Sequence, residues 1–131
     1  MAKEIISIPN APKLPFSPAI RAGQYIFLSG QGGALDPKTG DLIEGIEAQT
    51  KQCLENIKQI LAAAGSSLGH VVKVTVFLAN AADFNKMNEA YQSYFPEGFP
   101  ARSTAITGLV YPAMLIEMEC IAFEPLVERG K

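Results

Sequence analysis

The 131-residue chain is 48% hydrophobic and 18% charged, and its formal net charge is −2 at pH 7. This length suits a single domain, spanning residues 1–131, with one hydrophobic core. The chain has no apolar run of about 18 residues and no basic cluster among aromatics, which argues against a membrane span and a nucleic-acid partner. Its apolar composition indicates that part of the surface is buried between subunits.

The N-terminal region predicts strands and extended backbone. Lys3–Ile8 is a short strand, and prolines at positions 9, 12, 15 and 18 then fix an extended segment whose single aromatic is Phe16. Ala19–Ser29 predicts a hairpin whose second strand is apolar enough to be buried on both faces. The glycine-rich stretch Gly30–Gly33 lacks the sequence of a phosphate-binding loop, so it predicts a tight approach of backbone to backbone or to a ligand.

The middle of the chain predicts two amphipathic helices around a strand. Ile46–Ala64 carries one apolar stripe at helical spacing, Val71–Leu78 is a β-branched strand, and a second helix begins near Asn80 and ends before Pro96. Asn88 lies on the apolar face of this second helix. A buried amide without partners costs about 1–3 kcal/mol, so Asn88 either ties backbone segments together or faces a polar pocket.

Two strands are predicted within Phe99–Phe123. The first carries Arg102 as its single charge, and the second alternates apolar residues with Glu117 and Glu119, which therefore share a face. If the two strands pair as a hairpin, Arg102 lies roughly 5–8 Å from a carboxylate. That arrangement fits either a small-anion site with a built-in base or an ion pair on a solvated face, and the pattern alone favours the ion pair.

This order of elements predicts an α/β (α+β) fold, a two-layer sandwich with a mixed sheet and two helices on one face. The uncovered face of the sheet is most simply covered by another subunit. Cys53 and Cys120 fall on apolar faces as reduced core residues, and the N-terminus has no apolar core of a signal peptide, so we expect a cytoplasmic protein. With His70 as the single histidine, no metal site or serine-hydrolase triad is predicted.

Several motifs resemble those of the RidA/YjgF family of imine deaminases, also called L-PSP endoribonuclease-like, and the match covers nearly the whole chain. They are Asn10–Pro12, Leu28–Gln31, Asp36–Gly40, Lys73–Phe77, Asp83–Tyr91, Phe99–Ser103 and Ile116–Glu119. The resemblance implies a chorismate-mutase-like fold with a six-stranded sheet and a homotrimer with clefts between subunits. It also implies hydrolysis of reactive enamines and imines to 2-oxo acids and ammonia, without a cofactor.

The resemblance also assigns roles to individual residues. Arg102 would bind the substrate carboxylate, and Glu117 would orient and deprotonate the attacking water. Ser29, Gly30 and Asn88 would line or shape the cleft.

Two further substrate-binding positions depart from the family pattern. Phe16 stands where typical members have tyrosine, and Thr104 where many have cysteine. A non-catalytic metabolite-binding trimer therefore remains an alternative. A ribonuclease is a second alternative, weakened by the acidic charge and the single histidine.

Overall fold

A computed structural model describes residues 2–125, and within that range the chain forms six strands, two α-helices and two short 3-10 turns. The elements are β1 (Glu4–Ile6), β2 (Ala19–Ala22), β3 (Tyr25–Gly32), α1 (Ile46–Ala63), β4 (Val71–Leu78), α2 (Phe84–Gln92), β5 (Ala101–Ile106) and β6 (Ile116–Phe123). These bounds confirm every strand and helix predicted from the sequence pattern to within a few residues.

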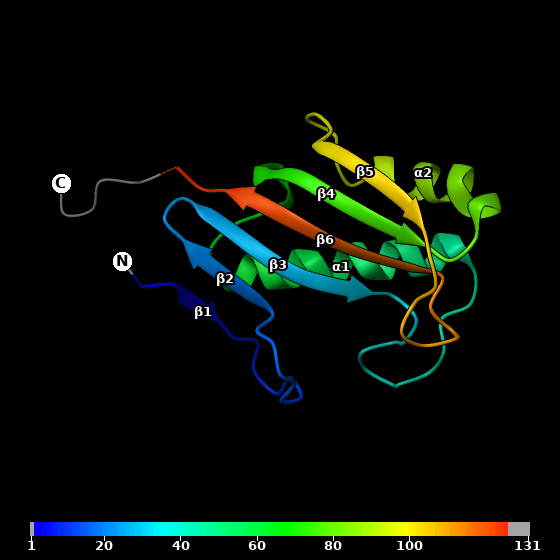
Figure 1. Ribbon diagram of the computed structural model, residues 1–131, viewed down its shortest axis with the longest axis horizontal. Coiled ribbons are helices and arrows are strands. Elements are labelled where there is room, and N and C mark those ends of the chain that lie inside the picture. Colours follow the sequence, from blue (N-terminus) through cyan, green and yellow to red (C-terminus); the bar gives the residue numbers. More distant parts are fainter. Residues whose placement is uncertain (1, 126–131) are drawn as a thin grey trace.

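The strands form one mixed sheet in the order β1-β2-β3-β6-β4-β5. The pair β4 and β5 is parallel, and every other neighbouring pair is antiparallel. Parallel neighbours need a long crossover, which here contains α2. Figure 1 shows α1 and α2 behind the sheet, so the predicted two-layer arrangement is confirmed.

The core lies between the helices and the sheet. Alternate residues of β6, including Ile116, Met118 and Cys120, are buried against the helix layer, whereas Glu117 and Glu119 lie on the other face as predicted. Cys53 of α1 is also fully buried, and both cysteines are free thiols, as expected.

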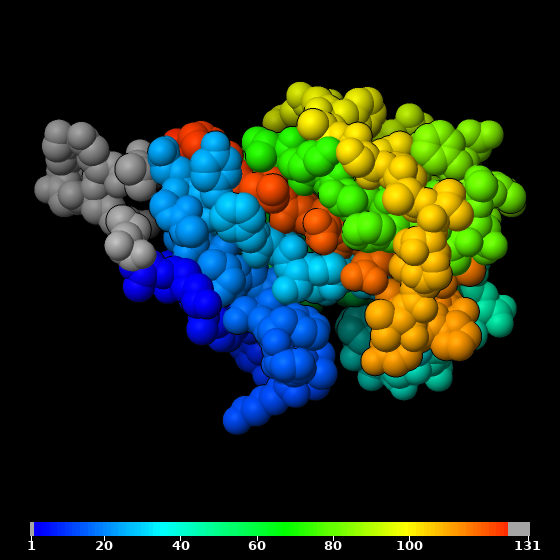
Figure 2. Space-filling model, in the orientation of Figure 1, coloured from blue at the N-terminus to red at the C-terminus, as the bar shows by residue number. Residues whose placement is uncertain are grey.

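Within residues 2–125, no helix lies over the second face of the sheet, and Figure 2 shows its strands side by side at the surface. Tyr25 and Phe27 of β3 are each 44% exposed there, and the Tyr25 ring lies edge-on to Phe123 with centroids 5.3 Å apart. The prediction that this strand is buried on both faces is therefore wrong for a single chain. Its apolar alternate residues instead form an exposed patch with Phe123.

The predicted hairpin of the last two strands is also wrong. β5 and β6 are not neighbours, because β4 lies between them and pairs with both. Val74 is in register with Arg102 on one side and with Cys120 on the other. Proximity along the chain favoured a hairpin, but the crossover through α2 delivers β5 to the outer edge of the sheet.

Two further sequence predictions, on the glycine-rich stretch and on the start of the second helix, can be compared with the structure. Gly33 lies against α1 so closely that a Cβ would collide with the Gln49 carbonyl oxygen, which confirms the predicted approach of backbone to backbone. The second helix is predicted to begin near Asn80, but Asn80 precedes a 3-10 turn, Ala81–Asp83, makes no side-chain capping bond, and α2 begins only at Phe84. In the described part of the chain, no helix has the length and apolarity needed to cross a membrane.

Candidate functional site

Arg102 lies on the edge strand β5 and reaches across to α2. Its register with the buried Val74 places it on the helix face of the sheet. Its Nη2 donates a 2.7 Å hydrogen bond to Oδ1 of Asn88, and its guanidinium carbon lies 4.8 Å from the Tyr91 ring centroid. The guanidinium is thus held by an amide and an aromatic face, both of which come from one helix.

The charge of Arg102 has no acidic partner within the described residues. The salt bridges found there are Arg21–Glu4, Lys51–Glu47 and His70–Glu124, and none includes Arg102. The ion pair with a strand carboxylate, which the sequence pattern alone favoured, is therefore not found in residues 2–125. An arginine that is half-buried and lacks a carboxylate is available to bind an anion.

The sequence left open whether Asn88 ties backbone segments together or faces a polar pocket, and its position in the structure decides between the two. Its amide oxygen accepts the Arg102 bond, and the residue lines an open pocket of about 290 Å³. The pocket is lined by Asn88, Tyr91, Gln92, Phe99, Pro100 and Arg102. Asn88 therefore faces a polar pocket. Thr104 lies two residues beyond Arg102 on the same face of β5 and is half-buried.

Sequence analysis did not single out Tyr91 as a site residue. It is 3% exposed, and burial raises the pKa of its hydroxyl to about 12 despite the opposing effect of Arg102. The available signal was its helical spacing of three residues from Asn88 on the face that also carries Phe84. That signal shows which side chains share a face but not which strand lies over them.

A second group of predicted site residues surrounds a β-bulge in β3. Leu28 pairs with Cys120 and Gln31 with Met118, so Ser29 and Gly30 together oppose Glu119. The Glu117 carboxylate lies directly against Gly30, in the space that a Cβ would occupy. A glycine is therefore required at position 30 for this carboxylate to keep its place.

The proline-rich N-terminal segment is fastened beside this bulge. Ser29 donates its hydroxyl hydrogen to the Ser17 carbonyl oxygen at 2.6 Å, and its N–H donates to the Pro18 carbonyl oxygen at 3.0 Å. Phe16, 55% exposed, then lines an open pocket of about 500 Å³ together with Gly30. The structure thus brings Phe16, Ser29, Gly30 and Glu117 into one neighbourhood.

The two groups do not meet within one chain. Arg102 is in register, through Val74, with Cys120, which is on the helix face of the sheet. Glu117 is an odd number of residues from Cys120 along β6 and so points to the opposite face. The helix-face group is Asn88, Arg102 and Thr104, and the open-face group is centred on Glu117 and Gly30.

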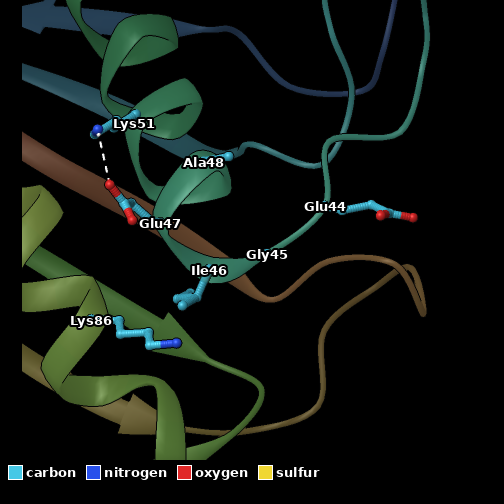
Figure 3. Close-up of a pocket in the computed structure, with 7 residues that line it drawn as sticks. All are labelled: Glu44, Gly45, Ile46, Glu47, Ala48, Lys51 and Lys86. Atoms are coloured by element: carbon cyan, nitrogen blue, oxygen red, sulfur yellow. Dashed lines mark hydrogen bonds and ion pairs between the residues drawn. The ribbon is translucent and has the colours of Figure 1, made fainter.

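A further hollow, of about 420 Å³, lies at the start of α1. Figure 3 shows Lys86 extending from α2 toward Ile46, while Lys51 bonds to Glu47 at 3.2 Å. None of the predicted site residues lines this hollow. Among residues 2–125, no group of three or more His, Cys, Asp or Glu side chains is placed to hold a metal ion.

Known proteins show the same pattern along nearly the whole chain. The family model described as Endoribonuclease L-PSP matches residues 8–124. A RutC family protein of Pyrococcus horikoshii is 50% identical over 125 residues, covering 93% of this chain and 98% of the relative. The human protein named 2-iminobutanoate/2-iminopropanoate deaminase is 39% identical over 127 residues, covering 95% of this chain and 92% of the relative.

A solved structure extends the likeness to three dimensions. TdcF of E. coli, crystallised with bound serine, matches with a TM-score of 0.85 at 33% identity, covering 93% of this chain and 99% of that one. The sequence motifs, the family model, the relatives and the solved structure therefore agree, and the chain belongs to the Endoribonuclease L-PSP family, which is the RidA/YjgF family.

Proposed function

We propose that this protein hydrolyses reactive imines that carry a carboxylate, releasing ammonia and a 2-oxo acid. The observation that carries the proposal is the state of Arg102. Its guanidinium is held by Asn88 and Tyr91, lines an open pocket, and has no acidic partner among the described residues. A planar fork held in this way suits bidentate binding of a small carboxylate. Relatives named as imine deaminases support the same chemistry.

We propose further that the complete site lies between chains. A reaction that uses both Arg102 and Glu117 needs a second copy of the chain, because one chain carries them on opposite faces of its sheet. β5 is the outer strand of the sheet, so Arg102 lies beside an edge that a neighbour can approach. The exposed patch of Tyr25, Phe27 and Phe123 supplies apolar surface for the association.

The proposed reaction has two stages. Arg102 binds the carboxylate and so orients the adjacent imine carbon. Water then adds to that carbon while Glu117 accepts one of its protons, and the bond between carbon and nitrogen becomes single. Glu117 returns the proton to nitrogen, which gives a carbinolamine. The hydroxyl proton of this carbinolamine then passes to nitrogen, the bond between carbon and nitrogen breaks as the carbonyl forms, and ammonia and the 2-oxo acid leave. General acid–base catalysis of this kind contributes about 10²–10⁴-fold.

This chain departs from the family pattern at two positions, Phe16 and Thr104. These departures are the reason for the alternative function, a trimer that binds such metabolites without turnover. Phe16 places a ring without a hydroxyl beside Gly30, and Thr104 places a hydroxyl rather than a thiol beside Arg102. Both substitutions change hydrogen bonding in the proposed cleft but leave Arg102 and Glu117 in place.

Ammonia release tests the function directly. With 2-iminopropanoate and 2-iminobutanoate generated in situ by an amino-acid oxidase, the protein is expected to accelerate formation of 2-oxo acid and ammonia above the spontaneous rate. The control is the same oxidase reaction without the protein. Binding of pyruvate or 2-oxobutanoate without any acceleration would establish the metabolite-binding alternative in place of the enzyme.

Association of the chain is testable without substrate. We expect sedimentation to give a species of three chains, each of 14.1 kDa, at micromolar concentration. Phe27→Lys should shift the protein toward monomer, because it places a charge within the exposed apolar patch. A stable monomer of the parent protein would rule out a site shared between chains.

A further inference from the structure

We propose that the aromatic rings of Phe84 and Tyr91 on α2 are positioning residues that hold the Arg102 guanidinium in one plane, so that a carboxylate meets a preset fork. This inference rests on the proposed function, because it assigns a role to residues behind the arginine that binds the substrate. It goes beyond that function, since it assigns a role in substrate binding to two rings that take no part in the proposed reaction.

The geometry places both rings within reach of the charge. The guanidinium carbon lies 4.8 Å from the Tyr91 ring centroid and 5.8 Å from that of Phe84. Both distances fall within the approximately 6 Å over which a cation is attracted to an aromatic face. Because the two rings are seven residues apart on one helix, they lie two turns apart on the same face, with Asn88 between them.

The hydrogen bonds define what remains for a ligand. Asn88 takes one hydrogen of Nη2, and the contact of Nη1 with Sδ of Met87 at 3.9 Å is weak. A guanidinium has five N–H donors. One is occupied by Asn88, so enough remain for two parallel bonds to a carboxylate. The rings fix the plane of these donors without using any of them.

The environment of the Tyr91 hydroxyl indicates that the ring, and not the hydroxyl, interacts with the Arg102 guanidinium. Its oxygen is buried and has no hydrogen-bond partner in the described structure. Burial raises its pKa to about 12, so the group is neutral near pH 7 and does not compensate the charge of Arg102. A buried hydroxyl without a partner is unfavourable, so hydrogen bonding does not explain a tyrosine at this position.

The test compares ring removal with hydroxyl removal. Tyr91→Met keeps an apolar side chain of similar length but removes the aromatic face, and it is expected to weaken 2-oxobutanoate binding, measured by calorimetry, about 3- to 30-fold. For an imine substrate, the Michaelis constant should rise by a similar factor. Tyr91→Phe keeps the ring without the hydroxyl and should retain most of the binding that Tyr91→Met loses.

Phe84→Leu, at a ring that is 40% exposed, should weaken binding about 2- to 3-fold and tests the proposal even if Tyr91→Met does not assemble.

Tyr94 offers a matched control. It is a second tyrosine close to α2, but its hydroxyl bonds to Glu55 at 2.8 Å and its ring is not in contact with Arg102. Tyr94→Met is expected to change the melting temperature but not 2-oxobutanoate binding. Parental binding in both Tyr91→Met and Phe84→Leu would overturn the inference, as would a failure of Tyr91→Phe to retain binding.

The inference and the proposed function fail in different ways. A parent protein that binds 2-oxobutanoate through Arg102 but turns over no imine would contradict the deaminase and leave the positioning role standing. A parent that turns over imines, with unchanged Michaelis constants in both ring variants, would contradict only the positioning role. A parent protein that neither binds 2-oxobutanoate nor turns over imines would contradict both the deaminase function and the positioning role of the rings.

Discussion

Glu117→Gln is expected to lose about 10²–10⁴-fold in turnover of carboxylate-bearing imines while binding 2-oxo acids with near-parental affinity. The amide keeps the shape of the side chain that lies against Gly30, so the bulge in β3 stays filled. It cannot accept a proton from water, however, and so removes the proposed base. The measurement is steady-state turnover beside calorimetric binding of 2-oxobutanoate.

Glu119→Gln is the matched control for this substitution. Glu119 lies on the same face of β6, two residues along, and is more exposed than Glu117. It makes no predicted contact with the substrate, so its variant should retain most of the parental turnover. Parental rates in Glu117→Gln, combined with a severe loss in Glu119→Gln, would transfer the role of base to Glu119.

Local periodicity was enough to predict the elements of this fold. The helical stripe over Ile46–Ala64 and the β-branched run Val71–Leu78 each appear where the sequence placed them. Periodicity indicates which face of a helix or strand is buried, and it can be recognised from the consecutive residues of that element alone. The alternation that separates Glu117 from Met118 is of the same kind, and the structure confirms it.

Strand pairing could not be predicted in the same way. Phe99–Phe123 contains two consecutive strands joined by the loop of residues 107–115, and their proximity along the chain favours pairing them directly. The crossover through α2 instead sets β5 parallel to β4, and β6 pairs on the other side of β4. Nothing in the residues of β5 or β6 alone specifies this order, since it arises from packing α2 against the sheet.

The same limit applies to the candidate site. Sequence pattern identified Arg102, Glu117 and Asn88 as separate candidates, but it suggested the wrong partner for the arginine, a strand carboxylate. The structure joins Arg102 to Asn88 and Tyr91 and places Glu117 on the opposite face. The apolar alternate residues of β3, predicted to be buried, are exposed in one chain. Burial between chains would leave the same sequence pattern as burial within one, so the pattern does not distinguish the two.

Arg102→Lys should likewise be a severe loss, of about 10²-fold or more in the specificity constant for carboxylate-bearing imines. Lysine preserves the charge, so a purely electrostatic role predicts a small change. It replaces a planar fork with a single ammonium on a flexible stem and cannot bond to Asn88 and a carboxylate in one fixed plane. The imine carbon would then lose its alignment with the water activated by Glu117.

The chain contains a matched control for this exchange as well. Arg21 lies on β2, where it donates to the Ala64 carbonyl oxygen and pairs with Glu4 at 3.4 Å, and neither partner belongs to the proposed site. Arg21→Lys should therefore affect only stability, by about 0–1 kcal/mol for its exposed ion pair, and leave turnover at the parental level. Sedimentation of both variants separates loss of assembly from loss of chemistry. An assembled Arg102→Lys protein with near-parental turnover would show that charge alone suffices at this position and would remove the bidentate fork from the mechanism.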